Sequence, residues 1–198
     1  MGRTIAILVF DGAEEMDFVG PWEVLAAAAE PVPGDRVLLI AESREPVTCE
    51  KGLRVLPDAT YDDAPAPDVI LLPGGSGARR EIANPATVDW LQRVAPGCDW
   101  VTSVCTGAFL LLGSGLAKGR RITTHHDFLD DLRAMSGATV VEGQRFVRDG
   151  NVVSAGGVMS GIEMSLWLVR TLYGPEAEAH TRSYIAYDHP PRDAVPGG

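Results

Sequence analysis

A cysteine stands between two contrasting segments in the stretch VTSVCTGAFLLLG, residues 101–113. The residues before it, from Trp100 to Val104, are typical of a buried strand, and Gly107 to Leu116 is typical of a helix. A sharp turn between a strand and a helix would expose the Cys105 side chain, as a nucleophile elbow does. The N-terminus of the following helix would favour the thiolate form of that side chain. Cys105 is therefore predicted to be a nucleophile. The alternative is a buried, small apolar side chain, which is a common role for a free cysteine.

Polar groups and glycines also follow the other predicted core strands. The run Thr4 to Phe10 is followed by DGAEEMD, residues 11–17, and Asp68 to Leu72 is followed by Pro73-Gly74-Gly75. A possible strand, Arg121 to Thr124, is followed by His125 and His126. The carboxyl ends of parallel strands meet at one edge of a sheet, where ligands bind. The sequence thus predicts a single site with a carboxylate, a glycine loop, a thiol and imidazoles.

Within this site, Asp17 is a candidate general acid or base close to the sulfur. The alternative is a first-turn carboxylate that is favoured by the helix dipole. The backbone N–H groups of Gly75 and Thr106 are predicted to stabilise a developing negative charge, as an oxyanion hole does. Glu14 and Glu15 compete with Asp17 for the acid role, but both are expected to face solvent.

Phosphate, metal and cofactor sites are not expected. The loop at Gly74 and Gly75 lacks the Lys-Ser/Thr pair of a P-loop and the third glycine of a dinucleotide fingerprint, so a tight turn is the better interpretation. Adjacent residues such as His125 and His126 rarely aim at one ion, and no further ligands are evident. One of the two histidines is expected to cap or line the pocket. The other cysteines, Cys49 and Cys98, lack a comparable setting and are predicted to be structural.

The elements that position these residues alternate between strand and helix, which predicts right-handed βαβ units and a mainly parallel, doubly wound sheet. The predicted fold is α/β, a single-domain three-layer sandwich over residues 1–189, followed by a flexible tail over 190–198. A hairpin is predicted around Asp149-Gly150-Asn151. Predicted strands cover 4–10, 36–41, 53–56, 68–72, 100–104 and two runs within 145–154, and predicted helices cover 17–29, 85–93, 107–116, 128–135, 161–172 and 176–187.

Composition limits the partners. The chain has 198 residues and a formal net charge of −10, which argues against nucleic acid and against an anionic membrane surface. No run reaches the roughly 18 apolar residues of a spanning helix, and the N-terminal apolar run is too short for a signal peptide. Three cysteines form no disulfide framework. The expected location is therefore the cytoplasm, and the expected partner is a small-molecule substrate.

Several motifs together resemble the ThiJ/PfpI superfamily, which has the class I glutamine amidotransferase-like fold, a flavodoxin-like architecture. They are GAEEMD (12–17), LLPGG (71–75), VTSVCTGA (101–108), GLAKGRRITTHH (115–126) and VRDGNVVSAGGVMSGIE (147–163). Within the superfamily, DFVGPWEVL (17–25) is most similar to the isonitrile hydratases and to the front domain of AraC-type regulators. The ending PPRDAVPGG contains no basic region, so a DNA-binding regulator is not expected.

The resemblance implies hydration of an isonitrile to an N-substituted formamide. Cys105 would form a covalent thioimidate, Asp17 would act as acid and base, and Thr106, the family threonine, would orient water or Asp17. It also implies a homodimer, and no cofactor. Trp22 and Met159, together with Gly74, His125 and His126, are predicted to line the pocket.

One departure and three alternatives accompany this hypothesis. Isonitrile hydratases usually have an aromatic residue where this chain has His126, so one pocket wall is expected to be polar. A glyoxalase or deglycase activity on dicarbonyls is favoured by His125 and disfavoured by Asp17, because those relatives use Glu. A sensor would oxidise Cys105 to a sulfinate held by protonated Asp17. A peptidase, which needs a cysteine–histidine dyad, is the least favoured.

Overall fold

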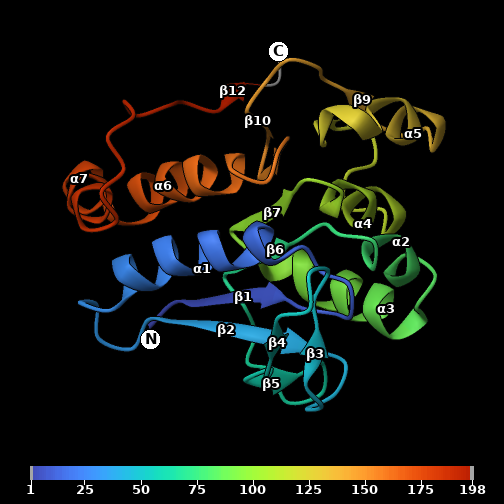
Figure 1. Cartoon of the computed structure of the whole chain (residues 1–198), viewed down its shortest axis with the longest axis horizontal. Helices are drawn as coiled ribbons and strands as arrows, with labels where there is room; N and C mark the ends of the chain where they lie inside the picture. The colour runs from blue at the N-terminus through green and yellow to red at the C-terminus, as the bar shows by residue number, and fades with distance from the viewer. Residues whose placement is uncertain (1, 197–198) are drawn as a thin grey trace.

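The computed structural model describes residues 2–196 and confirms the predicted α/β fold (Figure 1). One eight-stranded sheet has the order β12-β10-β11-β7-β6-β1-β2-β5. The strands are β1 Thr4–Leu8, β2 Arg36–Ala41, β3 Val47–Thr48, β4 Arg54–Val55, β5 Ala59–Thr60, β6 Val69–Leu72, β7 Trp100–Val104, β8 Arg121–Ile122, β9 Thr139–Val140, β10 Phe146–Asp149, β11 Val152–Ala155 and β12 Val195–Pro196. The α-helices are α1 Glu15–Ala29, α2 Ala78–Glu81, α3 Pro85–Val94, α4 Gly107–Gly113, α5 Leu129–Ala134, α6 Ser160–Tyr173 and α7 Pro175–Tyr184, and short 3₁₀ turns cover Ala95–Gly97 and His126–Phe128.

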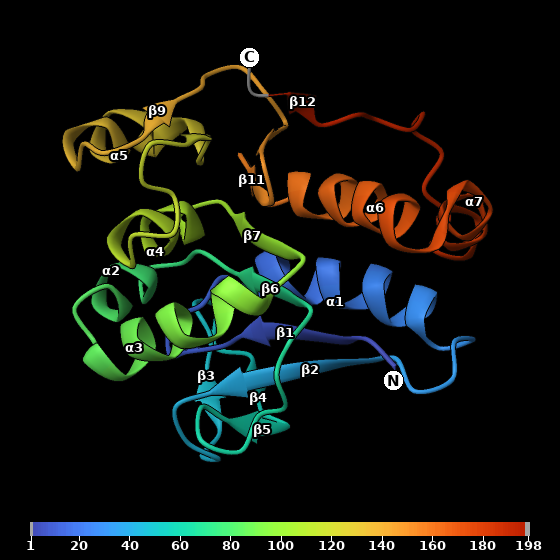
Figure 2. The same ribbon diagram turned by 180° about the vertical axis from the view of Figure 1, so that it is seen from behind.

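Helices cover both faces of the sheet. Figures 1 and 2 show α1, α6 and α7 on one face and α3 and α4 on the other. The central strands β1 and β6 are fully buried because each is a continuous apolar run without alternation. Every pairing in this sheet is parallel except β10 with β11. The carboxyl ends of β1, β6 and β7 therefore meet at one edge.

Most of the predicted elements are present with small shifts at their ends. The helix after Cys105 stops at Gly113, three residues early, because the Ser114 hydroxyl donates to the Leu110 carbonyl and Gly115 turns the chain with φ +83. The predicted hairpin forms between β10 and β11, with Gly150 at φ +63. The possible strand over 121–124 is present as β8. The short helix α2 and the two-residue strands β3, β5, β9 and β12 are absent from the prediction, because segments this short carry no periodic signal.

The C-terminal segment, for which the sequence predicts a flexible tail over 190–198, is described as far as residue 196. Val195 pairs with Val147 of β10 in parallel register. The Arg192 guanidinium lies 3.4 Å from the Glu163 carboxylate of α6. Residues 197 and 198 lie outside the described part of the chain, and the domain boundary at 189 stays a prediction.

Among the helices of residues 2–196, none combines the length and the hydropathy needed to cross a bilayer.

Candidate active site

Cys105 occupies the tight turn between β7 and α4. Its backbone has φ +54, an uncommon conformation for a residue other than glycine. Two bonds hold it there: the Cys105 N–H donates to the Ala155 carbonyl at 2.9 Å, and the Thr124 hydroxyl donates to the Cys105 carbonyl at 2.8 Å. The turn also needs Gly107, since a Cβ there would lie 2.1 Å from the Leu72 carbonyl oxygen. The local geometry is that of a nucleophile elbow.

Asp17 reaches the same place from the first turns of α1. Its side chain is fully buried, and Oδ2 accepts a bond from the Gly74 N–H at 2.9 Å. Its Oδ1 has no hydrogen-bond partner within residues 2–196. A Cβ on Gly74 would lie 2.5 Å from Thr106 Oγ1 and 2.8 Å from Asp17 Oδ2. Only glycine therefore allows α1, the loop after β6 and the elbow to approach this closely.

The Asp17 carboxyl group and the Cys105 thiol each affect the pKa of the other. Burial raises the pKa of Asp17 to about 7, and the Gly74 N–H opposes part of that rise. Burial, followed by the Asp17 charge, raises the pKa of Cys105 to about 12, against the opposing Thr106 N–H and hydroxyl. Burial and the Asp17 charge thus act against the thiolate that a helix N-terminus favours. At neutral pH the thiol keeps its proton, and Asp17 is close to half-ionised.

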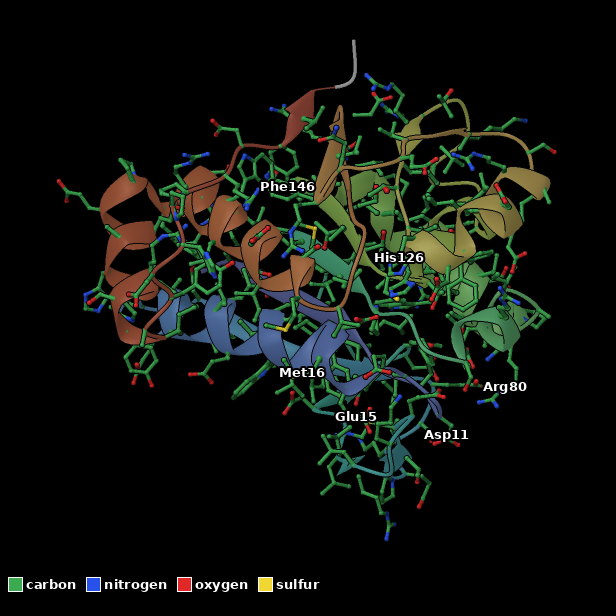
Figure 3. The ribbon with its side chains drawn as sticks, turned by 45° about the horizontal axis from the view of Figure 1, so that its top comes forward. Asp11, Glu15, Met16, Arg80, His126 and Phe146 are labelled. Atoms are coloured by element: carbon green, nitrogen blue, oxygen red, sulfur yellow. The ribbon has the colours of Figure 1, made fainter. Side chains whose placement is uncertain are left out.

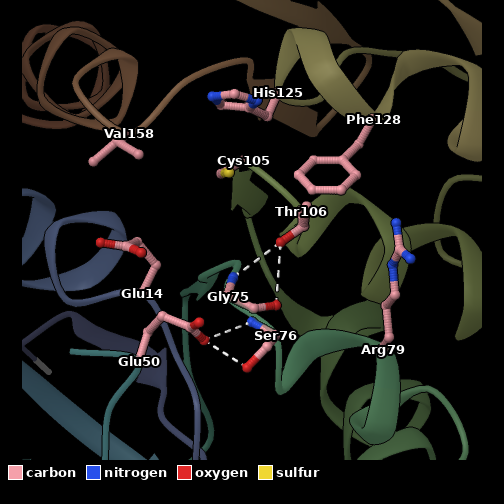
Figure 4. A pocket seen from close by; sticks show the side chains of 10 residues that line it. All are labelled: Glu14, Glu50, Gly75, Ser76, Arg79, Cys105, Thr106, His125, Phe128 and Val158. Atoms are coloured by element: carbon pink, nitrogen blue, oxygen red, sulfur yellow. Dashed lines mark hydrogen bonds between the residues drawn. The ribbon is translucent and has the colours of Figure 1, made fainter. Parts of the chain in front are cut away.

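Thr106 and Gly75 bind each other across the pocket floor (Figure 4). The Gly75 N–H donates to Thr106 Oγ1 at 2.9 Å, and the Thr106 hydroxyl lies 3.3 Å from the Gly75 carbonyl oxygen. Since the Gly75 N–H is engaged in this way, it is not free to serve as the oxyanion donor that the sequence predicted. The Thr106 N–H, which is directed toward the sulfur, is the remaining predicted donor.

A pocket of about 420 Å³ opens above the Cys105 sulfur (Figure 4). Phe128 and Val158 contribute apolar wall, and His125 lies over the sulfur. The sequence analysis missed most of this wall, since its members come from loops and short helices distant from Cys105 in the chain. The lining residues are Glu14, Glu50, Gly75, Ser76, Arg79, Cys105, Thr106, His125, Phe128 and Val158.

Of the five predicted pocket residues, His125 lines this pocket, and the other four lie elsewhere. Trp22 is 38% exposed on α1, and Met159 is 51% exposed just before α6. The His126 side chain is 79% exposed and stacks on His125, with ring centroids 4.2 Å apart (Figure 3). Gly74 lies beneath the floor, between Thr106 and Asp17. The predicted polar pocket wall at His126 is therefore not formed, because this side chain lies outside the pocket.

Three consecutive side chains at the rim could ligate a metal. His125, His126 and Asp127 bring one ligand atom each within 4.8 Å of one another. His125 Nδ1, however, already accepts the Asp127 N–H at 3.3 Å. The expectation that the chain uses no metal and no cofactor stays a prediction.

Comparison with known proteins follows this geometry. The model of the DJ-1/PfpI family matches residues 3–171. An isonitrile hydratase of Pseudomonas putida is 35% identical over 98% of this chain and 83% of its own length. A glutathione-independent glyoxalase, DJR-1.2 of Caenorhabditis elegans, is 28% identical over 87% of this chain and 89% of its own. A crystal structure of a ThiJ/PfpI family protein from Pseudomonas syringae superimposes with a TM-score of 0.88 at 30% identity, covering 98% of this chain and 78% of that one.

Proposed function

The chain belongs to the DJ-1/PfpI family, and we propose that it is an isonitrile hydratase-like enzyme, which adds water to an isonitrile to give an N-substituted formamide. The observation that carries this proposal is the pair formed by Cys105, which lines the pocket, and the fully buried Asp17, which lies close enough to interact with its thiol. Asp17 has one unpartnered oxygen and a pKa of about 7, which suits a group that both takes and returns a proton at neutral pH. The similarity to an isonitrile hydratase over nearly the whole chain supports it.

In the proposed first step, ionised Asp17 takes the thiol proton of Cys105 while the sulfur attacks the terminal carbon of the isonitrile. Asp17 then returns that proton to the same carbon. A carbon–sulfur bond and a carbon–hydrogen bond form, and the N≡C triple bond becomes the C=N double bond of a thioimidate. The high pKa of the Cys105 thiol makes a base necessary, because little thiolate forms without one.

In the proposed second step, Asp17 takes a proton from water, and the hydroxide attacks the thioimidate carbon. The proton of the added hydroxyl passes to the nitrogen, the carbon–sulfur bond breaks and the carbon becomes the carbonyl of the formamide. The departing sulfur recovers its proton from Asp17. The Thr106 hydroxyl, held by Gly75 beside this carbon's expected position, is the group proposed to orient the water.

The proposal is tested by incubating the chain with cyclohexyl isocyanide and measuring the formamide by chromatography. We expect formamide from the native chain and none above background from Cys105→Ala or Asp17→Asn. A folded native chain that produces no formamide, while iodoacetamide still alkylates Cys105, would overturn the proposal. Circular dichroism of each variant separates loss of chemistry from loss of fold.

A second candidate is glyoxalase or deglycase activity on dicarbonyls. His125 supports it, because its ring lies over the Cys105 sulfur, where a second acid or base is useful (Figure 4). Glyoxalase activity would be favoured if the native chain produces lactate from methylglyoxal, His125→Ala does not, and no formamide forms from isonitriles. If neither substrate is turned over, and peroxide converts Cys105 to a sulfinate, the oxidation-sensor hypothesis takes precedence.

We further propose that the enzyme is a homodimer. Met16, Val19 and Trp22, spaced three residues apart on α1, form an exposed apolar stripe, each between 37% and 38% exposed. A stripe of large apolar side chains on one helix is typical of a surface that a partner covers. All three cysteines are free, which supports the predicted cytoplasmic location, where thiols stay reduced.

A further inference from the structure

Glu50 is brought to the pocket by a part of the chain that has no other role in the site. It lies in the turn between β3 and β4, and its backbone N–H donates to the Ala13 carbonyl at 2.8 Å. The next N–H, of Lys51, donates to the Glu15 carboxylate at 2.7 Å. These two bonds fix the turn against the start of α1, so the Glu50 side chain enters the pocket from a defined position (Figure 4).

The Glu50 carboxylate is also oriented by the loop that follows β6. Its Oε2 accepts the Ser76 N–H at 2.9 Å and the Ser76 hydroxyl at 2.5 Å. Its Oε1 makes no hydrogen bond to the described residues, so one oxygen is free to accept a bond from a ligand. The two Ser76 bonds hold the pKa of Glu50 below its ordinary value, and the group is ionised at neutral pH.

The other charged groups of the lining already have partners. Glu14 lies 2.9 Å from the Lys51 ammonium. Arg79 lies 2.5 Å from the Asp131 carboxylate, and its guanidinium is 5.1 Å from the ring centroids of both Phe109 and Phe128. Within residues 2–196, Glu50 is the charged lining group with no opposite charge within 4.0 Å. Lys51 and Arg80 are near enough to help lower the pKa of Glu50, but neither forms an ion pair with it. Glu50 therefore contributes a negative charge and an unbonded carboxylate oxygen to the pocket wall.

We propose that Glu50 selects substrates whose side chain carries an ammonium group, so that the preferred isonitrile is a cationic one. This inference rests on the proposed function. An alkylammonium placed against Glu50 Oε1 would gain a charge-assisted hydrogen bond without displacing any existing partner. An anionic side chain would have to compete with Asp131 for Arg79 while being repelled by Glu50.

The test uses three isonitriles of closely similar shape at pH 7.5: cyclohexyl isocyanide, 4-isocyanopiperidine, whose ring nitrogen is protonated, and 4-isocyanocyclohexanecarboxylate. We expect kcat/KM to be highest for the cation and lowest for the carboxylate. Glu50→Gln keeps an amide oxygen that can accept both Ser76 bonds but removes the charge. It should lower the cation-to-neutral ratio of kcat/KM about fivefold, the size expected for a partly exposed ion pair.

The control variant is Glu45→Gln, which removes the same charge from an exposed residue outside this pocket. Because the whole chain carries a net charge of −10, any cation is attracted at long range, and Glu45→Gln measures that effect alone. The cation-to-neutral ratio should stay at its native value in Glu45→Gln. An unchanged ratio in Glu50→Gln, or a native preference for the carboxylate, would overturn the inference.

A second measurement separates failure of this inference from failure of the proposed reaction. Cys105 attacks methanethiosulfonates, forming a disulfide and releasing methanesulfinate. Rates are compared for the neutral methyl reagent and the 2-aminoethyl reagent, whose primary ammonium can donate a hydrogen bond to Glu50 Oε1, with the Cys105 peptide quantified by mass spectrometry. If no isonitrile is hydrated, the hydratase proposal fails. Glu50 selectivity then stands if Glu50→Gln reduces the cationic preference of this thiol reaction about fivefold, and it falls if the preference is unchanged.

Discussion

The free energy of unfolding of an Asp17→Asn variant, relative to that of the native chain, should increase as the pH rises. Asp17 is fully buried, and its pKa rises from 3.8 in the unfolded chain to about 7 in the fold because burial disfavours the charge. A group whose pKa is raised by folding contributes stability below its unfolded pKa and loses that contribution as pH rises through the folded pKa. The rise corresponds to about 4 kcal/mol at 1.36 kcal/mol per pKa unit. Asparagine avoids this loss because it does not ionise.

The structure indicates where the asparagine amide would sit. Its oxygen can accept the Gly74 N–H bond that Asp17 Oδ2 now accepts, and its NH₂ would occupy the position of the unpartnered Oδ1. The NH₂ group then lacks a strong acceptor, which costs a constant amount at every pH. The pH dependence of the difference between the two proteins is therefore the informative quantity, rather than the difference at one pH.

The assay is urea unfolding followed by tryptophan fluorescence, for native chain and Asp17→Asn, between pH 5.5 and 8. The range starts above the sequence pI of about 4.8, where the chain is least soluble. The free energy of unfolding of Asp17→Asn minus that of the native chain should increase by about 2 kcal/mol over this range. Asp62→Asn, an exposed aspartate, controls for the loss of one charge. A difference that stays flat with pH would refute the assignment of a raised pKa to Asp17.

Three more predictions follow from the same geometry. If ionised Asp17 is the base, kcat/KM for a neutral isonitrile should rise about tenfold per pH unit below pH 7 and level off above it, and a fall above pH 7 would contradict this role. Gly74→Ala should lose activity and about 1–3 kcal/mol of unfolding free energy in urea titrations, because its Cβ would lie 2.5 Å from Thr106 Oγ1. The control Gly97→Ala should change neither quantity, because the space around Gly97 is open. Val19→Lys should convert the proposed dimer to a monomer in light scattering, whereas an unchanged mass would remove α1 from the interface.

The sequence predicts the catalytic edge well because strong local signals place it there. Continuous apolar runs specify β1 and β6 within two residues, since a strand buried on both faces tolerates few polar side chains. The small and β-branched residues of WVTSV specify β7. The order of a parallel sheet then brings the residues after those strands together. Cys105, Thr106 and the Gly74–Gly75 loop needed no further information to be placed beside one another.

The face of α1 could not be predicted in the same way. Apolar side chains occur all around this helix: Phe18 and Val24 are buried, while Val19 and Trp22 are exposed. A helix with such a weakly amphipathic pattern does not reveal which side packs on the sheet. Trp22 was therefore assigned to the pocket, although it lies on the outer surface.

The charge state of the nucleophile and the charge of the pocket depend on contacts that no local pattern records. A helix N-terminus after Cys105 is visible in the sequence and favours thiolate, but the burial of the sulfur against Asp17 is not visible, and it decides the sign of the pKa shift. Glu50 reaches the pocket from a turn whose flanking strands pair over only two residues each, and Ser76, 26 residues further on, orients it. The residues of the proposed reaction are thus positioned by strands that the sequence predicts, whereas the proposed substrate selection depends on a loop whose position only the fold supplies. A relative with the same elbow and a different residue in place of Glu50 should accordingly keep the chemistry and change the substrate.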